Sequence, residues 1–255
     1  MLQILVIPAL TDNYVYLLHD AETETTACID PSEAAPVTQR LHAIGWSLTH
    51  ILNTHHHWDH TGGNSALIAE YAPEVIGAAC DVARIPGLTR GVGGGEVFKL
   101  GAADVHVFFI PGHTSGHVAY WLPDPGILFS GDTLFSFGCG RLFEGTAQQM
   151  WQSLVALREL PEDTLVYCGH EYTEANIRFA LTIDPENATL HEHAKTARAR
   201  RAKGSPTVPS RIGIERAGNP FLRADDPALK QRLGMAQAAD HSVLAEIRRR
   251  KDEFR

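Results

Sequence analysis

The heptapeptide THHHWDH concentrates imidazole and carboxylate groups that can bind metal ions. In an extended segment, residues two apart point to the same side, so we expect His55 and His57 to converge on one metal while His56 points elsewhere. Asp59 and His60 follow where the chain turns toward a helical run, and we expect them to face a second metal. Imidazole combined with carboxylate favours Zn²⁺, Fe or Mn over Ca²⁺ or Mg²⁺.

Three later segments, PGHTSGH, SGDT and CGHEY, have a common arrangement. Each follows an apolar run that is typical of a strand, and each places a ligand-type residue beside a glycine: His113, Asp132 and His170. Loops at strand ends, held by a rigid sheet, are common positions for functional residues. A single histidine in such a place is more often structural, but five histidines and two aspartates at strand exits favour a metal centre.

Short strand-like runs dominate the first two thirds of the chain, and most are bounded by Gly, Pro, Asp or Asn. They are Leu2–Ile7, Tyr14–Leu18, Ala27–Ile29, His50–Leu52, Val105–Ile110, Ala119–Leu122, Ile127–Phe129 and Leu165–Tyr167. Helical patterns are expected at Ala34–Ile44, Asn64–Tyr71 and Ala147–Leu160. Strands interspersed with helices predict sheets layered with helices.

After Tyr172 the strand-like runs largely end, and Ala, Arg, Lys and Glu recur at helical spacing. We therefore expect a catalytic domain over residues 1–172 and a helical domain over residues 173–255. In the second domain a basic stretch, Lys195–Lys203, leads into a loop at Gly204–Gly218. Two helices are expected after this loop, at Pro227–Ala239 and His241–Phe254.

The glycine run Gly91–Gly95 invites comparison with phosphate-binding loops. It has no following Lys-Ser/Thr pair and leads into a strand-like run rather than a helix, so neither the P-loop nor the dinucleotide pattern fits. We expect a flexible turn.

Composition narrows the possible partners. The chain has 255 residues and a net charge of −8, which disfavours binding to nucleic acid because that requires a basic surface. No apolar run of about 18 residues is present to span a membrane. The four cysteines lack CxxC spacing, and the N-terminus shows no features of a signal peptide. We therefore expect a cytoplasmic protein with reduced thiols, and a monomer.

The motifs THxHxDH, GHTxGH, GDTLF and CGHEYT, in this order, resemble those of the metallo-β-lactamase superfamily, and within it the hydroxyacylglutathione hydrolases (glyoxalase II). The resemblance implies an α+β fold, a four-layer αββα sandwich followed by a smaller all-helical C-terminal domain. It also implies two divalent metal ions per chain, with zinc favoured over iron or manganese.

Carried over position by position, the resemblance distributes seven ligands between the two metals. The first metal receives His55, His57 and His113; the second receives Asp59, His60 and His170; Asp132 bridges them. Asp59 and Asp132 are the carboxylates expected to take part in catalysis. His117 and Asp30 are expected to contact the ligands rather than the metals.

The implied substrate is a glutathione thioester. A thiol has a pKa near 8.5, so a thiolate leaves with little or no proton donation, which fits motifs that offer no separate acid. The implied substrate contacts are Arg141, Phe143, Tyr172, Arg248 and Lys251. Arg and Phe stand at the first two positions, where the family's better-known form has Lys and Tyr.

A helical wheel of the C-terminal segment places Lys251 on the packed side and Arg248 on its rim, with Arg249 roughly opposite. The nearest enzymatic alternative is a mononuclear iron dioxygenase that acts on glutathione persulfide. A β-lactamase proper fits less well because of the helical C-terminal domain, and a nuclease fits less well because of the negative charge. A non-enzymatic metal-binding protein fits less well because the ligand set mixes carboxylates with imidazoles.

Overall fold

The chain folds into two compact units in the computed structural model, which describes residues 2–254. Unit 1 comprises residues 1–109 and 116–131, and unit 2 comprises residues 110–115 and 132–255. Unit 2 thus takes one short segment, which carries His113, from the first half of the chain. The expected division into sequence domains at residue 172 stays a prediction.

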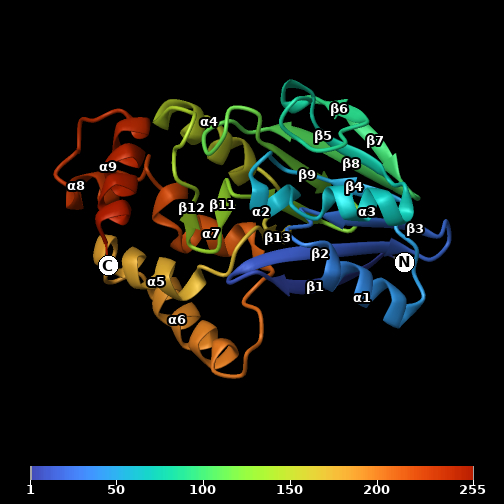
Figure 1. The fold of residues 1–255 in the computed structure, drawn as a ribbon. Coiled ribbons are helices and arrows are strands. Elements are labelled where there is room, and N and C mark those ends of the chain that lie inside the picture. The colour runs from blue at the N-terminus through green and yellow to red at the C-terminus, as the bar shows by residue number, and fades with distance from the viewer. Residues whose placement is uncertain (1, 255) are drawn as a thin grey trace. The chain divides into compact units, whose positions relative to one another are not determined.

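Unit 1 contains a six-stranded mixed sheet in which the strands follow one another in chain order (Figure 1). The strands are β1 Leu2–Ala9, β2 Asn13–Asp20, β3 Thr25–Ile29, β4 His50–Leu52, β5 Glu74–Ala78 and β6 Arg90–Val92. The pairs β1–β2 and β2–β3 are antiparallel, and β3 to β6 are parallel. Parallel neighbours need long crossovers, and helices α1 (Ala34–Ile44) and α3 (Asn64–Tyr71) lie in the first two.

Four further strands of unit 1 form antiparallel hairpins in the order β7–β8–β9–β10. They span Val97–Leu100, Ala103–Phe109, Val118–Leu122 and Ile127–Gly131. The ring of Phe129 on β10 lies 5.4 Å from that of Tyr16 on β2, and the hydroxyl of Tyr120 donates to the Asn53 carbonyl at 2.8 Å. The opposite face of the first sheet packs against Leu41 of α1 and Leu67 of α3. Unit 1 therefore consists of a layer of helices, the six-stranded sheet and the sheet of β7 to β10, in that order.

Unit 2 is mainly helical but contains two short antiparallel pairs. The pairs join β11 (Leu134–Phe135) to β12 (Gly138–Cys139), and β13 (Leu165–Cys168) to β14 (Ser210–Arg211). Its helices are α4 Ala147–Arg158, α5 Thr173–Ile183, α6 Ala188–Arg201, α7 Ile212–Gly218, α8 Pro227–Arg232 and α9 Asp240–Glu253, with a 3₁₀ turn at Pro220–Leu222. Helix α4 starts at a capping box, in which the Thr146 and Gln149 side chains each accept from the other's backbone N–H.

The expected fold class is confirmed: mixed sheets with helices, and a helical C-terminal part. The predicted bounds of α1, α3 and β4 match the structure. Two expectations were wrong. Helix α8 ends at Arg232 rather than at residue 239. Gly234, two residues later, has a φ of +74°, the left-handed conformation that commonly follows the end of a helix. The predicted loop 204–218 contains α7, a helix too short to show clear periodicity. No helix within residues 2–254 is both long and apolar enough to cross a bilayer.

Candidate metal centre

The first predicted ligand pair of unit 1 lies between β4 and α2 (Trp58–Thr61), in a segment that bends at Thr54 and His55. His55 is completely buried, and its Nε2 lies 3.0 Å from Nδ1 of His57. The two rings therefore direct nitrogens at one point, as the predicted alternation requires. This spacing is typical of two ligands on one ion.

His56, between these two histidines in the sequence, has different neighbours. Its Nδ1 lies 3.4 Å from a carboxylate oxygen of Asp81, and its Nε2 lies 3.3 Å from Nη1 of Arg84. Asp81 is buried and also pairs with Arg84. These contacts give His56 a place outside the ligand pair.

The second pair of unit 1 consists of Asp59 and His60 in helix α2. Nε2 of His60 lies 3.5 Å from Oδ2 of Asp59. Its other nitrogen, Nδ1, lies 3.1 Å from Oδ2 of Asp30, which also accepts from the backbone and hydroxyl of Thr54, each at 2.7 Å. Asp30 thus orients His60, the supporting role expected for it. The Asn13 amide also donates to the Asp59 carboxylate at 3.1 Å, a contact that was not predicted from the sequence.

His117, the other expected supporting residue, is buried and stacks on His55 with ring centroids 4.7 Å apart. A glycine is required nearby at position 131. A Cβ there would approach Nε2 of His117 to 2.8 Å, and the backbone φ of +48° disfavours other residues. The ring of His117 therefore supports that of His55 from one side.

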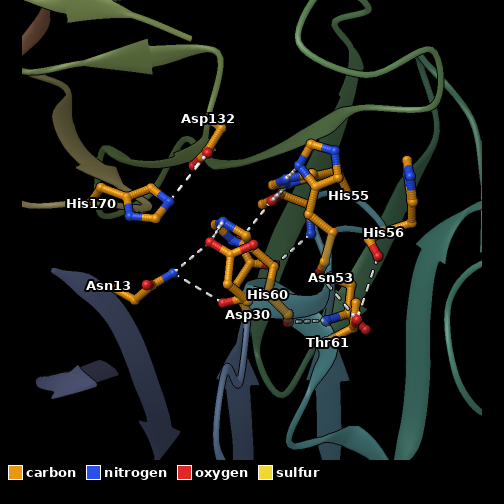
Figure 2. Close-up of polar contacts among 12 residues, drawn as sticks. Asn13, Asp30, Asn53, His55, His56, His60, Thr61, Asp132 and His170 are labelled. Atoms are coloured by element: carbon orange, nitrogen blue, oxygen red, sulfur yellow. Dashed lines mark hydrogen bonds and ion pairs between the residues drawn. The ribbon is translucent and has the colours of Figure 1, made fainter. Parts of the chain in front are cut away.

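Unit 2 contributes Asp132 with a histidine on either side of it. Oδ2 of Asp132 lies 3.4 Å from Nε2 of His113 and 3.2 Å from Nε2 of His170. All three side chains are buried. Figure 2 shows the second contact, in which the imidazole of His170 faces the carboxylate. One carboxylate oxygen beside two imidazoles is the arrangement that a bridging ligand needs.

The remaining nitrogen of His113 is also held. Its Nδ1 lies 2.9 Å from the backbone carbonyl of Arg141, to which it donates, so that Nε2 is left as the acceptor. The ring of His170 stacks on Tyr172 with centroids 4.8 Å apart and planes 2° from parallel. The rings of the two predicted histidine ligands of unit 2 are thus held by Arg141 and Tyr172, which are also predicted substrate contacts.

The donor set and its spacing fit divalent transition metals. Within each unit the paired ligand atoms lie 3.0 to 3.5 Å apart. Two ligands bound about 2.0–2.2 Å from one tetrahedral ion would lie roughly 3.4 Å from each other. The seven predicted ligands are also the seven side chains that the described residues offer as able to hold a metal ion: His55, His57, Asp59, His60, His113, Asp132 and His170.

A groove of about 420 Å³ in unit 2 brings together three of the five predicted substrate contacts, Arg141, Phe143 and Arg248. Phe143 is 61% exposed. Arg248 is only 7% exposed; its Nη1 donates to the Cys139 carbonyl at 2.8 Å, and its Nε has no hydrogen-bond partner among the described residues. Arg248 is therefore more deeply buried than the helical wheel indicated.

One expectation for helix α9 needs correction. Arg249 was expected on the opposite side, but it lines the same groove, with its guanidinium paired to Glu246 and Glu253. Lys251 does not line the groove. Its Nζ donates to the Ala175 carbonyl at 3.2 Å, and burial and then the neighbouring Arg248 lower its pKa to about 8.

Comparisons with known proteins cover the whole chain. The model of the family described as the metallo-beta-lactamase superfamily matches residues 11–170, and that described as the hydroxyacylglutathione hydrolase C-terminus matches residues 171–254. A hydroxyacylglutathione hydrolase of Methylococcus capsulatus is 55% identical, with both chains covered in full. One of Maricaulis maris is 52% identical over 97% of this chain and 96% of the relative.

Solved structures share the fold. ETHE1 from Myxococcus xanthus is 25% identical, with a TM-score of 0.68 over 98% of this chain and 90% of that one. The subclass B3 metallo-beta-lactamase BJP-1 of Bradyrhizobium japonicum is 16% identical, with a TM-score of 0.58 over 90% and 92%. The second likeness concerns the fold alone.

The separate placement of His56 leads to a metal-binding prediction. His55→Ala and His57→Ala should each reduce the bound metal measured by elemental analysis, because each removes a ligand nitrogen. His56→Ala should keep the wild-type metal content, because its contacts are with Asp81 and Arg84. Equal metal loss in all three variants would contradict the alternation on which the ligand assignment rests.

Proposed function

We propose a mechanism for this chain as a hydroxyacylglutathione hydrolase of the metallo-β-lactamase superfamily, the family to which its two domain matches and full-length relatives assign it. Members of this family are thioester hydrolases. The chain cleaves S-(2-hydroxyacyl)glutathione, such as S-D-lactoylglutathione, to glutathione and a 2-hydroxy acid, the second step of the glyoxalase pathway of methylglyoxal detoxification. Relatives with this name over the whole length favour hydrolysis over the persulfide dioxygenase alternative.

The proposed metal centre is formed by the seven predicted ligands. One ion would be held by His55, His57 and His113, and the other by Asp59, His60 and His170, with Asp132 between them. The observation that carries this assignment is the position of the Asp132 carboxylate oxygen, 3.4 and 3.2 Å from one imidazole of each proposed set. Zinc is the favoured metal, since imidazole and carboxylate ligands with open positions are typical of catalytic zinc sites.

The ions, when bound, supply a water of lowered pKa and polarise the acyl oxygen. The chain itself orients the ligands and binds the substrate. Asp30 fixes the tautomer of His60, and the Arg141 carbonyl fixes that of His113, so each Nε2 is free of a proton. The departing thiolate needs no positioned acid, and none is required of these residues. Asp59 and Asp132 are the proposed catalytic carboxylates.

Recognition of the two glutathione carboxylates is assigned to the cations of unit 2. Arg141 and Arg248 line the groove, where the guanidinium of Arg248 is held by the Cys139 carbonyl at 2.8 Å and the Asp252 carboxylate at 2.9 Å. Arg141 can pair with a carboxylate in bidentate fashion. Phe143 lacks the hydroxyl of the family's better-known form and instead sets its ring against that of His113, with centroids 5.2 Å apart. Tyr172 is proposed to contact the substrate beside His170.

Lys251 is proposed to act as a third cation for these carboxylates, although it lies outside the groove. Its ammonium lies 5.4 Å and 5.5 Å from the ring centroids of Phe179 and Phe254. Burial lowers its pKa most, the positive charges of Arg248, Arg178 and Arg141 lower it further, and Asp252 acts in the opposite direction. An anionic substrate would relieve the repulsion between these positive charges.

A cytoplasmic location and a monomeric state are also proposed. All four cysteines are free thiols, and Cys28, Cys139 and Cys168 are buried. Free thiols are usual in reducing compartments.

The activity itself is tested by comparing two substrates. Purified, metal-loaded protein should release free thiol from S-D-lactoylglutathione, and a chelator should abolish that release. Glutathione persulfide should cause no oxygen uptake. Oxygen uptake together with one metal per chain would favour the dioxygenase alternative.

Substitutions of the three proposed substrate-binding cations should weaken substrate binding. Arg141→Met, and Arg248→Met combined with Lys251→Met, should each raise KM roughly tenfold, as expected for losing a charge-assisted hydrogen bond of about 1–3 kcal/mol. The value of kcat should change much less, the pattern of lost uniform binding. Arg250→Met is the control, because Arg250 pairs with Glu246 outside the groove. An unchanged KM in both test variants, or an equal rise in the control, would exclude the groove as the glutathione site.

The lowered pKa of Lys251 leads to a pH dependence. The ammonium binds anions only while protonated, so kcat/KM should fall as pH rises through about 8, the pKa of the free enzyme's group. Lys251→Arg should remove this fall, because guanidinium stays protonated throughout the range. A profile between pH 6 and 10 that is identical in both proteins would assign the fall to another group.

A further inference from the structure

Glu215 in helix α7 is a buried carboxylate that the proposed mechanism does not use. It is 0% exposed, and no basic side chain pairs with it anywhere in residues 2–254. It accepts hydrogen bonds from the Phe137 backbone N–H at 2.8 Å, the Asn219 amide at 3.0 Å and the Ser210 hydroxyl. Burial raises its pKa to about 7. Such a group is costly to bury, so its contacts must offset that cost.

These contacts hold the β11–β12 hairpin, residues 134–139. Phe137 occupies its turn at φ +57°, a conformation that non-glycine residues rarely adopt, and the carboxylate binds its N–H. The Asn219 amide also donates to the carbonyls of Phe135 at 3.3 Å and Gly138 at 3.0 Å. Glu215 and Asn219 therefore form hydrogen bonds with both strands of the hairpin and with the turn between them.

The hairpin lies between a proposed metal ligand and a proposed substrate-binding residue in the sequence. Asp132 lies two residues before it and Arg141 two residues after it, and its base is closed by the bond from Gly140 N–H to the Thr133 carbonyl at 3.3 Å. The carbonyl of Arg141 accepts from Nδ1 of His113. A displacement of the hairpin would move the Arg141 guanidinium and loosen a metal ligand together.

We propose that Glu215 is a positioning residue for the thioester hydrolysis, acting through the β11–β12 hairpin to set the place of Arg141. The inference rests on the proposed role of Arg141 in substrate binding. It requires an acceptor at position 215 rather than a negative charge. A glutamine there could accept from Phe137 and Asn219 through its oxygen while its NH₂ group donates to Ser210.

A purely structural role would give a different pattern. Loss of a buried hydrogen-bond group anywhere in unit 2 should lower stability, but only loss at this hairpin should change KM. Asp184 provides the matched control: it is also buried and also bonded to several donors, including Arg223 and Asn187, and its contacts among the described residues do not include the hairpin.

The experiment compares Glu215→Leu, Glu215→Gln and Asp184→Leu in the full, metal-loaded chain. Glu215→Leu should raise KM several-fold and speed backbone amide hydrogen exchange over residues 134–141. Glu215→Gln should restore KM to within about twofold of the wild type. Asp184→Leu should lose stability with an unchanged KM. In an Arg141→Met background, Glu215→Leu should raise KM less than it does in the wild type, because both changes act on the contact that Arg141 makes.

An unchanged KM and unchanged exchange in Glu215→Leu would overturn the proposal, as would an equal KM rise in Asp184→Leu or additive effects with Arg141→Met. Should Glu215→Leu fail to fold, Asn219→Ala takes its place, because it removes the hydrogen bonds to the Phe135 and Gly138 carbonyls of the hairpin. The same outcomes then support or overturn the proposal. A wild-type protein without thioesterase activity would refute the proposed function instead, and the exchange measurement would still report on the hairpin.

Discussion

The imidazole of a metal ligand has two nitrogens, and what holds one of them decides where the other points. His60 meets this requirement through the Asp30 carboxylate, and His113 meets it through the Arg141 carbonyl. In both cases Nδ1 is occupied and Nε2 faces a carboxylate that is itself a predicted ligand. The orientation of these two histidines therefore depends on the contacts that hold the Asp30 carboxylate and the Arg141 carbonyl in place.

The helical C-terminal part takes on a larger role in this view than substrate binding alone. Arg248 donates to the Cys139 carbonyl on the β11–β12 hairpin, while Glu215 and Asn219 hold the hairpin from helix α7 and the turn after it. The hairpin leads into Arg141, whose side chain lines the groove and whose carbonyl holds His113. The proposed substrate binding and the orientation of a predicted metal ligand therefore depend on one short segment of backbone.

The sequence predicted what depends on local spacing. The convergence of His55 and His57 and the positions of the other predicted ligands just past strand ends could be predicted from local spacing, and so could the bounds of helices α1 and α3. Contacts between distant segments could not be predicted in this way. The bond from Arg248 to Cys139 joins residues 109 apart, and that from Phe137 to Glu215 joins residues 78 apart. A helical wheel describes one helix, so it missed that Arg249 also lines the groove.

The central claim is that Asp132 lies between two metal ions that the seven predicted ligands share. A crystal structure of the metal-loaded protein, with anomalous scattering recorded at the metal edge, tests this most directly. The account predicts two peaks per chain, one within bonding distance of His55, His57 and His113, the other of Asp59, His60 and His170, both in contact with Asp132. A single peak, or a second peak that Asp132 does not touch, would contradict it.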